Sequence, residues 1–200
     1  MSSSTVASSP KVLSEYLTGS MAAEVALVVG YAGLIGLFAQ LVVHLPFTPV
    51  PITGQTFAVL FGASLLGPMR SLFGSALYLI AGLIGVPWFA AGSGGMSVAT
   101  SPSFGYIVGF IVASVLVGLL ARRGFDKGVL GTIAEMVMGN LAIYAFGLAW
   151  LAYSLHLPLL RAADLGAVPF LLGDLVKILV AALALPGMWK LAQRFASPRL

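Results

Sequence analysis

Hydrophobic residues along the chain occur in long runs with few charged residues, and the connections between the runs are rich in glycine, proline or polar residues. The runs cover about residues 21–43, 55–66, 69–84, 104–121, 129–153 and 170–191. A helix needs about 20 mainly apolar residues to cross a bilayer. The pattern therefore predicts an all-α integral membrane protein, a six-transmembrane-helix bundle in which the second span is short.

Two connections have an unusual composition. In residues 44–55 three prolines alternate with β-branched residues, which excludes a helix and favours extended backbone. Thr53, Gly54 and Gln55 follow the last proline, and the segment fits either the wall of a buried cavity or a rigid surface loop. Residues 85–103 are rich in glycine and serine, and here Trp88 and Phe89 offer an apolar surface to a ligand. Trp88 equally fits an aromatic residue of the membrane interface.

Composition narrows the class of protein. Of the 200 residues, 60% are hydrophobic and 8% are charged, against about 25% charged residues in a soluble domain. The basic residues are scattered among the connections, so we expect no binding of nucleic acid. Cysteine is absent and the only histidines are His44 and His156, so we expect no metal site.

Two charged residues lie in the first half of the last hydrophobic run. Asp174 and Lys177 are three residues apart, so on a helix they share a face and lower each other's cost of burial. Ionisable groups at membrane depth indicate a functional site by default. A carboxylate beside an ammonium suits a small ligand with an anionic end and polar donors, although an ion pair that only joins helices would give the same pattern.

The fifth run also carries polar side chains. Asn140 and Tyr144 are four residues apart on one helical face, where they either bridge helices or line a cavity. Glu135 is close in sequence to the basic turn at residues 122–127, and we expect its carboxylate to reach toward that turn.

The distribution of basic residues predicts the orientation in the membrane. Only Arg161 is assigned to one side, and the opposite side carries Lys11, Arg70, Arg122, Arg123, Lys127, Lys190, Arg194 and Arg199. Basic connections stay in the cytoplasm, so both termini are expected there. Residues 1–20 would be a flexible cytoplasmic N-terminal tail with a short surface helix at 12–17. Residues 21–192 would form one membrane domain, and 193–200 a cytoplasmic C-terminal tail.

Several segments together resemble a known family. They are residues 49–57 (PVPITGQTF), 62–67 (GASLLG), 77–89 (LYLIAGLIGVPWF), 102–110 (PSFGYIVGF) and 166–177 (GAVPFLLGDLVK). In this order they resemble BioY, the biotin-binding S component of energy-coupling factor (ECF) transporters, and the likeness covers roughly residues 20–192.

The resemblance implies capture and uptake of biotin across the bacterial cell (inner) membrane by a chain that is not an enzyme. The partners would be a transmembrane coupling protein, which docks on Ala22 and Ala26 of the first helix, and two cytoplasmic ATPase subunits. ATP would serve those subunits only, so we expect no cofactor here beyond the ligand biotin, and a homo-oligomer is compatible with the sequence. Biotin would contact Asp174, Lys177, Gln55, Gly54, Thr53, Trp88 and Phe89, with Asn140 and Tyr144 as further candidates.

Two other functions fit the same pattern. An ion-coupled secondary carrier would use Asp174 and Glu135 as relay groups, and its uptake would collapse with the ion gradient. An S component for another small vitamin would share the helix bundle and differ in the ligand contacts.

Overall fold

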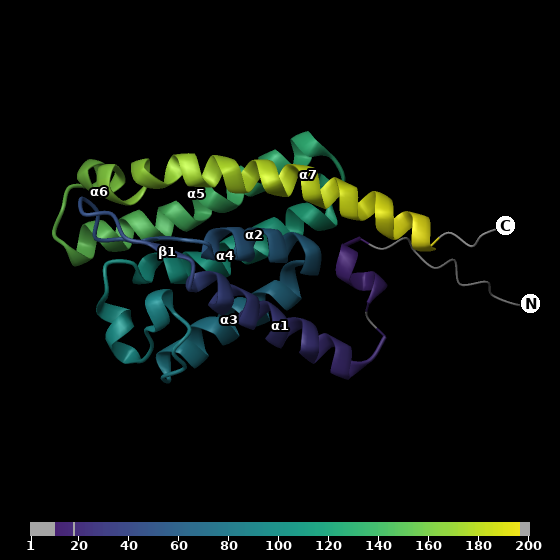
Figure 1. The fold of residues 1–200 in the computed structure, drawn as a ribbon, viewed down its shortest axis with the longest axis horizontal. Coiled ribbons are helices and arrows are strands. Elements are labelled where there is room, and N and C mark those ends of the chain that lie inside the picture. Colours follow the sequence, from purple (N-terminus) through teal and green to yellow (C-terminus); the bar gives the residue numbers. More distant parts are fainter. Residues whose placement is uncertain (1–10, 18, 197–200) are drawn as a thin grey trace, which may run out of the picture.

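The computed structural model describes residues 11–17 and 19–196, which form an elongated bundle of helices (Figure 1). The α-helices are α1 (Met21–Ala39), α2 (Gln55–Leu66), α3 (Pro68–Leu83), α4 (Phe104–Arg122), α5 (Val129–Ser154), α6 (Leu159–Gly166) and α7 (Leu171–Ala196). The short 3-10 helices are η1 (Leu13–Tyr16), η2 (Ala90–Gly92), η3 (Met96–Thr100), η4 (Phe125–Lys127) and η5 (Val168–Phe170). The helical architecture confirms the predicted mostly helical fold.

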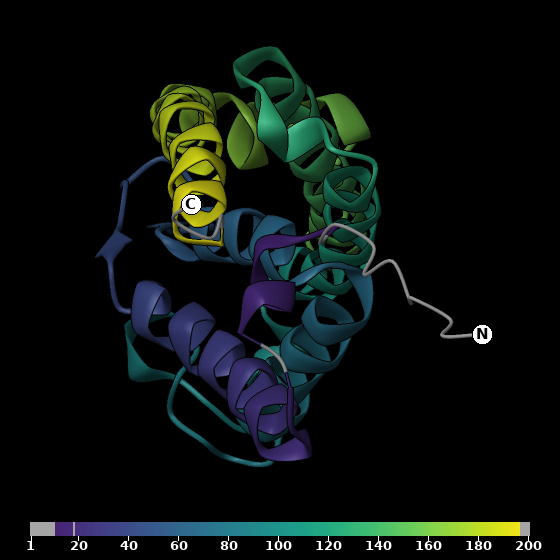
Figure 2. The same ribbon diagram turned by 90° about the vertical axis from the view of Figure 1, so that its right-hand side faces the viewer.

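Helix α2 lies in the middle of the bundle and contacts α1, α3, α4, α5 and α7 (Figure 2). The closest packing is between α4 and α5, where two glycines of α4 face the neighbouring helix. A Cβ added at Gly105 would lie 2.2 Å from Cβ of Trp150, and one at Gly109 would lie 3.0 Å from Cα of Ile143. Glycine at both positions therefore allows the two backbones to approach, as a GxxxG face does in membranes.

Four helical segments in the described part of the chain are long and apolar enough to cross a membrane: α1, α4, α5 and the stretch from α6 through α7. Helix α2 has 12 residues and α3 has 16. At 1.5 Å per residue α2 is about 18 Å long, shorter than the roughly 30 Å hydrocarbon core. Six hydrophobic segments are thus present as helices, but two of them are short for a full span.

The connection between α1 and α2 contains a small β-hairpin. Strands β1 (Val42–Val43) and β2 (Ile52–Thr53) pair antiparallel, with Val42 opposite Thr53. The predicted all-α fold is therefore wrong in this connection, because it contains two strands. Helix α1 also ends at Ala39, four residues before the predicted end of the first hydrophobic run at residue 43. The prolines keep residues 44–51 out of any helix, as predicted, and hairpin pairing satisfies backbone groups on either side of them.

The second half of the chain differs from the prediction in two places. Residues 154–168, expected to be a loop, contain α6, which begins after Pro158 at a position where proline is tolerated. Helix α7 continues through Pro186 to Ala196, whereas the membrane domain was predicted to end at residue 192. Proline inside a membrane helix is tolerated because neighbouring groups satisfy the freed carbonyl.

The segment before α1 packs on the bundle. Val12 is buried and η1 contacts α2 and α7. The guanidinium of Arg70 donates to the Glu24 carboxylate at 2.5 and 2.7 Å and to Oγ of Ser14 at 2.9 Å. The predicted short helix is therefore confirmed, but residues 12–16 do not form a flexible tail. The remainder of the tail predictions, at residues 1–10, 18 and 197–200, lies outside the described residues.

Two carboxylates are buried in the half of the bundle near η1. Glu135 is fully buried and accepts a hydrogen bond from Oγ of Ser64 at 2.8 Å, so the prediction that it reaches toward the basic turn is wrong. Asp126 accepts from Nε1 of Trp189 at 2.5 Å, and the ammonium of Lys127 lies 4.4 Å from the centre of the Trp189 ring. These contacts join η4 to α7 and α5 to α2.

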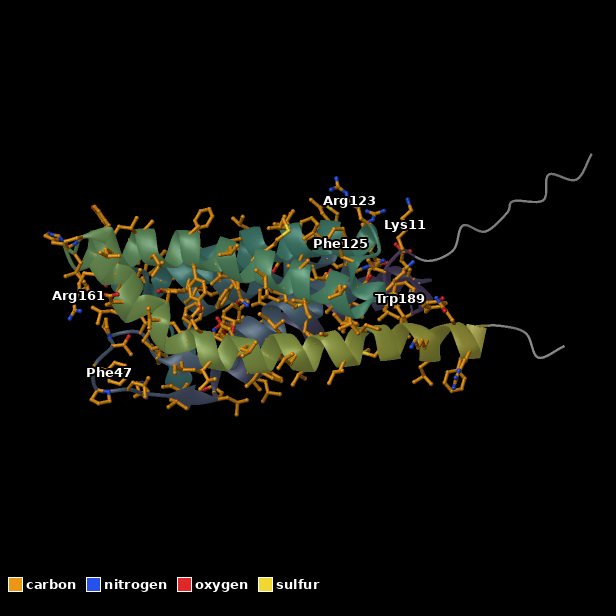
Figure 3. All side chains as sticks on the ribbon, turned by 90° about the horizontal axis from the view of Figure 1, so that it is seen from above. Lys11, Phe47, Arg123, Phe125, Arg161 and Trp189 are labelled. Atoms are coloured by element: carbon orange, nitrogen blue, oxygen red, sulfur yellow. The ribbon has the colours of Figure 1, made fainter. Side chains whose placement is uncertain are left out.

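Basic residues that the sequence assigned to opposite sides lie at opposite ends of the long axis of the molecule. Lys11, Arg123 and Trp189 lie at one end, and Phe47 and Arg161 lie at the opposite end (Figure 3). This arrangement agrees with the grouping of basic connections that the sequence predicted.

Candidate functional site

A cavity of about 310 Å³ opens among the hairpin, the 85–103 connection and helices α2, α4, α5 and α7. Its polar lining residues are His44, Thr53, Gln55, Thr56, Ser93, Ser97, Ser101, Ser103, Tyr106, Asn140, Tyr144, Asp174 and Lys177. Its apolar lining residues are Val50, Pro51, Ile52, Phe89, Ala90, Val98, Ile107, Phe110, Ile143 and Phe170. A mainly apolar cavity with a few convergent polar groups, of at least about 300 Å³, is typical of small-molecule sites.

Asp174 and Lys177 meet in the wall of this cavity. The first turn of α7 carries Asp174 and the next carries Lys177, and Nζ of Lys177 lies 3.2 Å from Oδ1 of Asp174. The side chain of Asp174 is 7% exposed and that of Lys177 is 22% exposed. The ion pair is therefore largely shielded from solvent and faces the cavity, where a bound ligand can reach it.

The Lys177 ammonium also binds the start of α2. Its Nζ donates to the carbonyl oxygen of Thr53 at 3.0 Å and to Oγ1 of Thr56 at 2.7 Å. Together with Asp174, these acceptors match the three N–H bonds of an ammonium group. The contacts fasten α7 to the end of the hairpin and to the first turn of α2.

Helix α5 supplies two polar side chains one helical turn apart. The hydroxyl of Tyr144 donates a short hydrogen bond to Oδ2 of Asp174, so the two oxygens of that carboxylate have different donors. Asn140 is 8% exposed, lines the cavity, and has no hydrogen-bond partner among the described residues. The amide faces the cavity, so a ligand with its own donor and acceptor can pair with it.

The hairpin end holds the remaining polar residues that the sequence predicted. Oγ1 of Thr53 donates to Oε1 of Gln55 at 3.0 Å, and Nε2 of Gln55 donates to the hydroxyl of Tyr78 at 2.6 Å. Gly54 is the N-cap of α2 and is not among the lining residues. A Cβ there would lie 3.0 Å from the carbonyl oxygen of Phe38, so Gly54 permits close approach of the hairpin to α1.

The two aromatic residues of the 85–103 connection have different positions. Phe89 lines the cavity and is 1% exposed. Trp88 does not line it. Nε1 of Trp88 donates to the carbonyl oxygen of Tyr78 at 2.9 Å, and its ring lies against Gly36 of α1. The structure thus brings Asp174, Lys177, Thr53, Gln55, Phe89, Asn140 and Tyr144 to one cavity and places Trp88 and Gly54 behind its wall.

Sequence reasoning missed several residues of the cavity. Thr56 was not among the predicted ligand contacts, yet it is an acceptor for Lys177. Tyr106 and Phe170 lie in apolar runs that resemble any other membrane span, so no local pattern distinguished them. The hydroxyl of Tyr106 donates to the carbonyl oxygen of Gly166 at 2.8 Å, which ties α4 to the end of α6.

The remaining predicted residues, Ala22 and Ala26, lie outside the cavity. Ala22 and Ala26 are exposed on the first turns of α1. Across residues 11–17 and 19–196, no group of three or more potential metal-ligating side chains is found.

Comparison with known proteins agrees with these features. The BioY family matches residues 7–194. The biotin transporter BioY of Thermotoga maritima is 37% identical over 153 residues, covering 74% of this chain and 89% of the relative. The probable biotin transporter BioY of Pyrococcus horikoshii is 35% identical over 162 residues, covering 81% and 93%.

A solved structure supports the fold. The crystal structure of the S-component for biotin from an ECF-type ABC transporter superposes with a TM-score of 0.76 and 23% sequence identity, covering 86% of this chain and 95% of that chain. The likeness concerns the arrangement of the helices. With the sequence matches, it identifies the chain as a multi-pass membrane protein that belongs to the BioY family.

Proposed function

We propose that this chain captures biotin on the outer side of the cell membrane and acts as the substrate-binding S subunit of an ECF-type transporter. The observation that carries the proposal is the hydrogen-bonded group formed by Asp174, Lys177 and Tyr144 in the wall of a cavity of about 310 Å³. The relatives named as biotin transporters share the family to which this chain belongs.

The chemistry of biotin fits the lining of the cavity. Biotin has a carboxylate tail, a ureido ring with two N–H donors and one carbonyl acceptor, and an apolar thioether ring. Lys177 offers an ammonium to an anionic or polar group, and Asp174 offers carboxylate oxygens to ureido N–H groups. Asn140 offers both a donor and an acceptor that the described residues leave unused. Phe89 and the other apolar lining residues would enclose the thioether ring and the aliphatic chain.

The positions of basic residues at the two ends of the bundle support an orientation in the membrane. The end with Lys11 and Arg123 would face the cytoplasm, since basic connections remain on that side. The cavity is lined by residues of the hairpin, which carries Phe47 at the opposite end, and would therefore open outward. We further propose that α2 and α3 complete a bundle of six membrane helices, with both termini in the cytoplasm.

The energy for uptake would come from partner subunits. The solved structure of similar fold is described as an S-component of an ECF-type ABC transporter, and we propose that this chain likewise works with a transmembrane coupling protein and two ATPase subunits. Ala22 and Ala26 are exposed one turn apart on α1 and would form the docking face for the coupling protein. The chain itself would need no cofactor.

Equilibrium binding of labelled biotin to the purified chain in detergent tests the proposal, with desthiobiotin and thiamine as competitors. We expect saturable one-to-one binding that desthiobiotin displaces and thiamine does not. Displacement by thiamine would point to an S component for another vitamin. Uptake without ATPase partners that collapses with an ion gradient would point to a secondary carrier.

A further inference from the structure

Tyr78 is a buried polar residue that does not line the cavity but contacts two of the segments that do. It lies in α3, is 0% exposed, and accepts a hydrogen bond from Nε2 of Gln55 at 2.6 Å. Its hydroxyl donates to the carbonyl oxygen of Trp88 at 3.3 Å. The Tyr78 hydroxyl therefore connects the start of α2 to the 85–103 connection.

The same tyrosine also holds the two aromatic residues of that connection by its ring. The ring centres of Tyr78 and Trp88 are 5.3 Å apart, and those of Tyr78 and Phe89 are 5.2 Å apart in an edge-to-face arrangement. A Cβ at Gly82, one turn further along α3, would lie 2.1 Å from Cζ of Phe89. The Phe89 ring, which forms part of the cavity wall, is thus seated against α3 by Tyr78 and Gly82.

A second residue supports the same backbone from α1. Nε2 of Gln40 lies 3.3 Å from the carbonyl oxygens of both Trp88 and Phe89 and donates to the carbonyl oxygen of Gly36 at 2.9 Å. Ala91, two residues after Phe89, has φ of 55°, a left-handed conformation that is unfavourable for a residue with a Cβ. Strain of this kind persists only where surrounding contacts hold the backbone.

On the side of the ligand, Gln55 joins Tyr78 to the ion pair. Oγ1 of Thr53 donates to Oε1 of Gln55 at 3.0 Å, and the carbonyl oxygen of Thr53 accepts from Lys177. A continuous series of contacts therefore runs from the proposed biotin-binding ammonium, through Thr53 and Gln55, to the Tyr78 hydroxyl and the Trp88 carbonyl.

We propose that Tyr78 is a positioning residue for ligand retention. By holding Gln55 on one side and residues 88–89 on the other, it keeps the 85–103 connection closed over the cavity and so sets how slowly biotin dissociates. This inference rests on the proposed function, since it concerns the lifetime of the biotin complex. Tyr78 is not among the lining residues, so it acts on the ligand through Gln55 and Phe89, which line the cavity.

The test replaces Tyr78 by phenylalanine, which keeps the ring and removes only the hydroxyl. Without it, Gln55 loses a buried acceptor and the Trp88 carbonyl keeps only Gln40, so we expect biotin to dissociate about five- to tenfold faster. We expect the association rate to change less. Stopped-flow or filter-binding measurements of both rate constants distinguish this result from a general loss of folded protein, which would lower the number of sites instead.

Tyr31→Phe is the matched control. Tyr31 is equally buried in α1, and its hydroxyl donates to the carbonyl oxygen of Val59 at 2.8 Å and lies 3.0 Å from Oγ of Ser114. It does not line the cavity. We expect Tyr31→Phe to lose stability without a faster dissociation of biotin. Equal dissociation rates for Tyr78→Phe and Tyr31→Phe would overturn the proposal.

A second variant and a second measurement cover other outcomes. Gln40 is exposed, so Gln40→Ala should fold, and we expect it also to speed dissociation by removing support from residues 88–89.

Hydrogen exchange follows the amides of Phe89 and Gly95, which donate to the carbonyl oxygens of Ser93 and Gly82. If the native chain binds no biotin, the proposed function fails. Faster exchange of these two amides in Tyr78→Phe, and not in Tyr31→Phe, would still support the positioning role.

Discussion

Lys177 and Thr56 lie on different helices, 121 residues apart in the chain, and Nζ of Lys177 donates to Oγ1 of Thr56 at 2.7 Å. The same ammonium donates to Asp174 and to the carbonyl oxygen of Thr53. All three N–H bonds of the ammonium thus have acceptors within the protein. An anionic ligand must therefore displace one of these acceptors or approach between them.

Replacement of Lys177 by methionine removes the positive charge and keeps an unbranched side chain of similar length. We expect biotin to bind more than about tenfold more weakly, which corresponds to at least about 1.4 kcal/mol, because the carboxylate of Asp174 loses its counter-charge and the ligand loses a donor. Equilibrium binding in detergent measures the change. Lys190→Met on the exposed side of the same helix is the control, and unchanged affinity of Lys177→Met would remove Lys177 from the site.

Asn140→Leu tests whether the ligand uses an amide in the cavity wall. The amide of Asn140 has no hydrogen-bond partner within the described residues, and it faces the cavity, so its polar atoms are not among the fully buried ones that lack a partner. We expect biotin to bind several-fold more weakly to the variant, because the ligand loses a donor and an acceptor. Met136→Leu, buried one turn earlier and outside the cavity lining, is the control. Unchanged binding would show that biotin does not use the amide.

Gly82→Ala tests the packing of the Phe89 ring against α3. The added Cβ would meet Cζ of Phe89 at 2.1 Å, so the ring must move toward the cavity. Overpacking of this kind costs about 1–3 kcal/mol, and we expect both lower thermal stability and weaker biotin binding. At Gly30 of α1 nothing lies within 4 Å of an added Cβ, so Gly30→Ala should lose neither property. Equal behaviour of the two variants would contradict the contact.

The stability of the chain should depend on the ionisation of Asp126. Burial raises the pKa of Asp126 from its ordinary 3.8 to about 6, and the hydrogen bond from Trp189 offsets only part of this effect. The folded protein therefore holds this proton more tightly than the unfolded chain does. The contribution of Asp126 to the free energy of unfolding should be greatest below pH 3.8 and should fall by about 3 kcal/mol as the pH rises through about 6.

Thermal unfolding between pH 4 and 7 measures this contribution by comparison with Asp126→Asn. Asparagine is uncharged and keeps an oxygen for Trp189, so the variant should lack this loss and be the more stable protein at pH 7. Asp164→Asn, at an exposed carboxylate of α6, should retain the pH dependence of the native chain. The same slope in all three proteins would argue against a raised pKa of Asp126.

Ala26→Trp separates ligand capture from transport. Ala26 is exposed on α1, away from the cavity, so the bulky side chain should leave biotin binding unchanged. It should prevent close docking of the coupling protein, since small residues permit the approach of two membrane helices. Co-purification with the coupling protein and uptake in cells are the measurements. Val25→Trp on the same exposed turn is the control. Full transport by Ala26→Trp would exclude this face.

The sequence by itself determined the class of the protein and most of its helices. Long apolar runs can be stable in a membrane only as helices, so their limits follow from composition and breaker residues. The boundaries of α2, Gln55 and Leu66, were predicted correctly for this reason. Asp174 and Lys177 were found because charges are rare in hydrocarbon and their spacing places them on one helical face.

Only the tertiary structure decided which side chains meet. Trp88 and Phe89 are consecutive aromatic residues that the sequence does not distinguish. The Trp88 ring packs against Gly36 and the Phe89 ring against Gly82, and only Phe89 lines the cavity. The partner of Glu135 is Ser64 of α2 rather than the nearby basic turn. Such contacts join residues far apart in the chain and depend on how helices pack, which local pattern and composition do not specify.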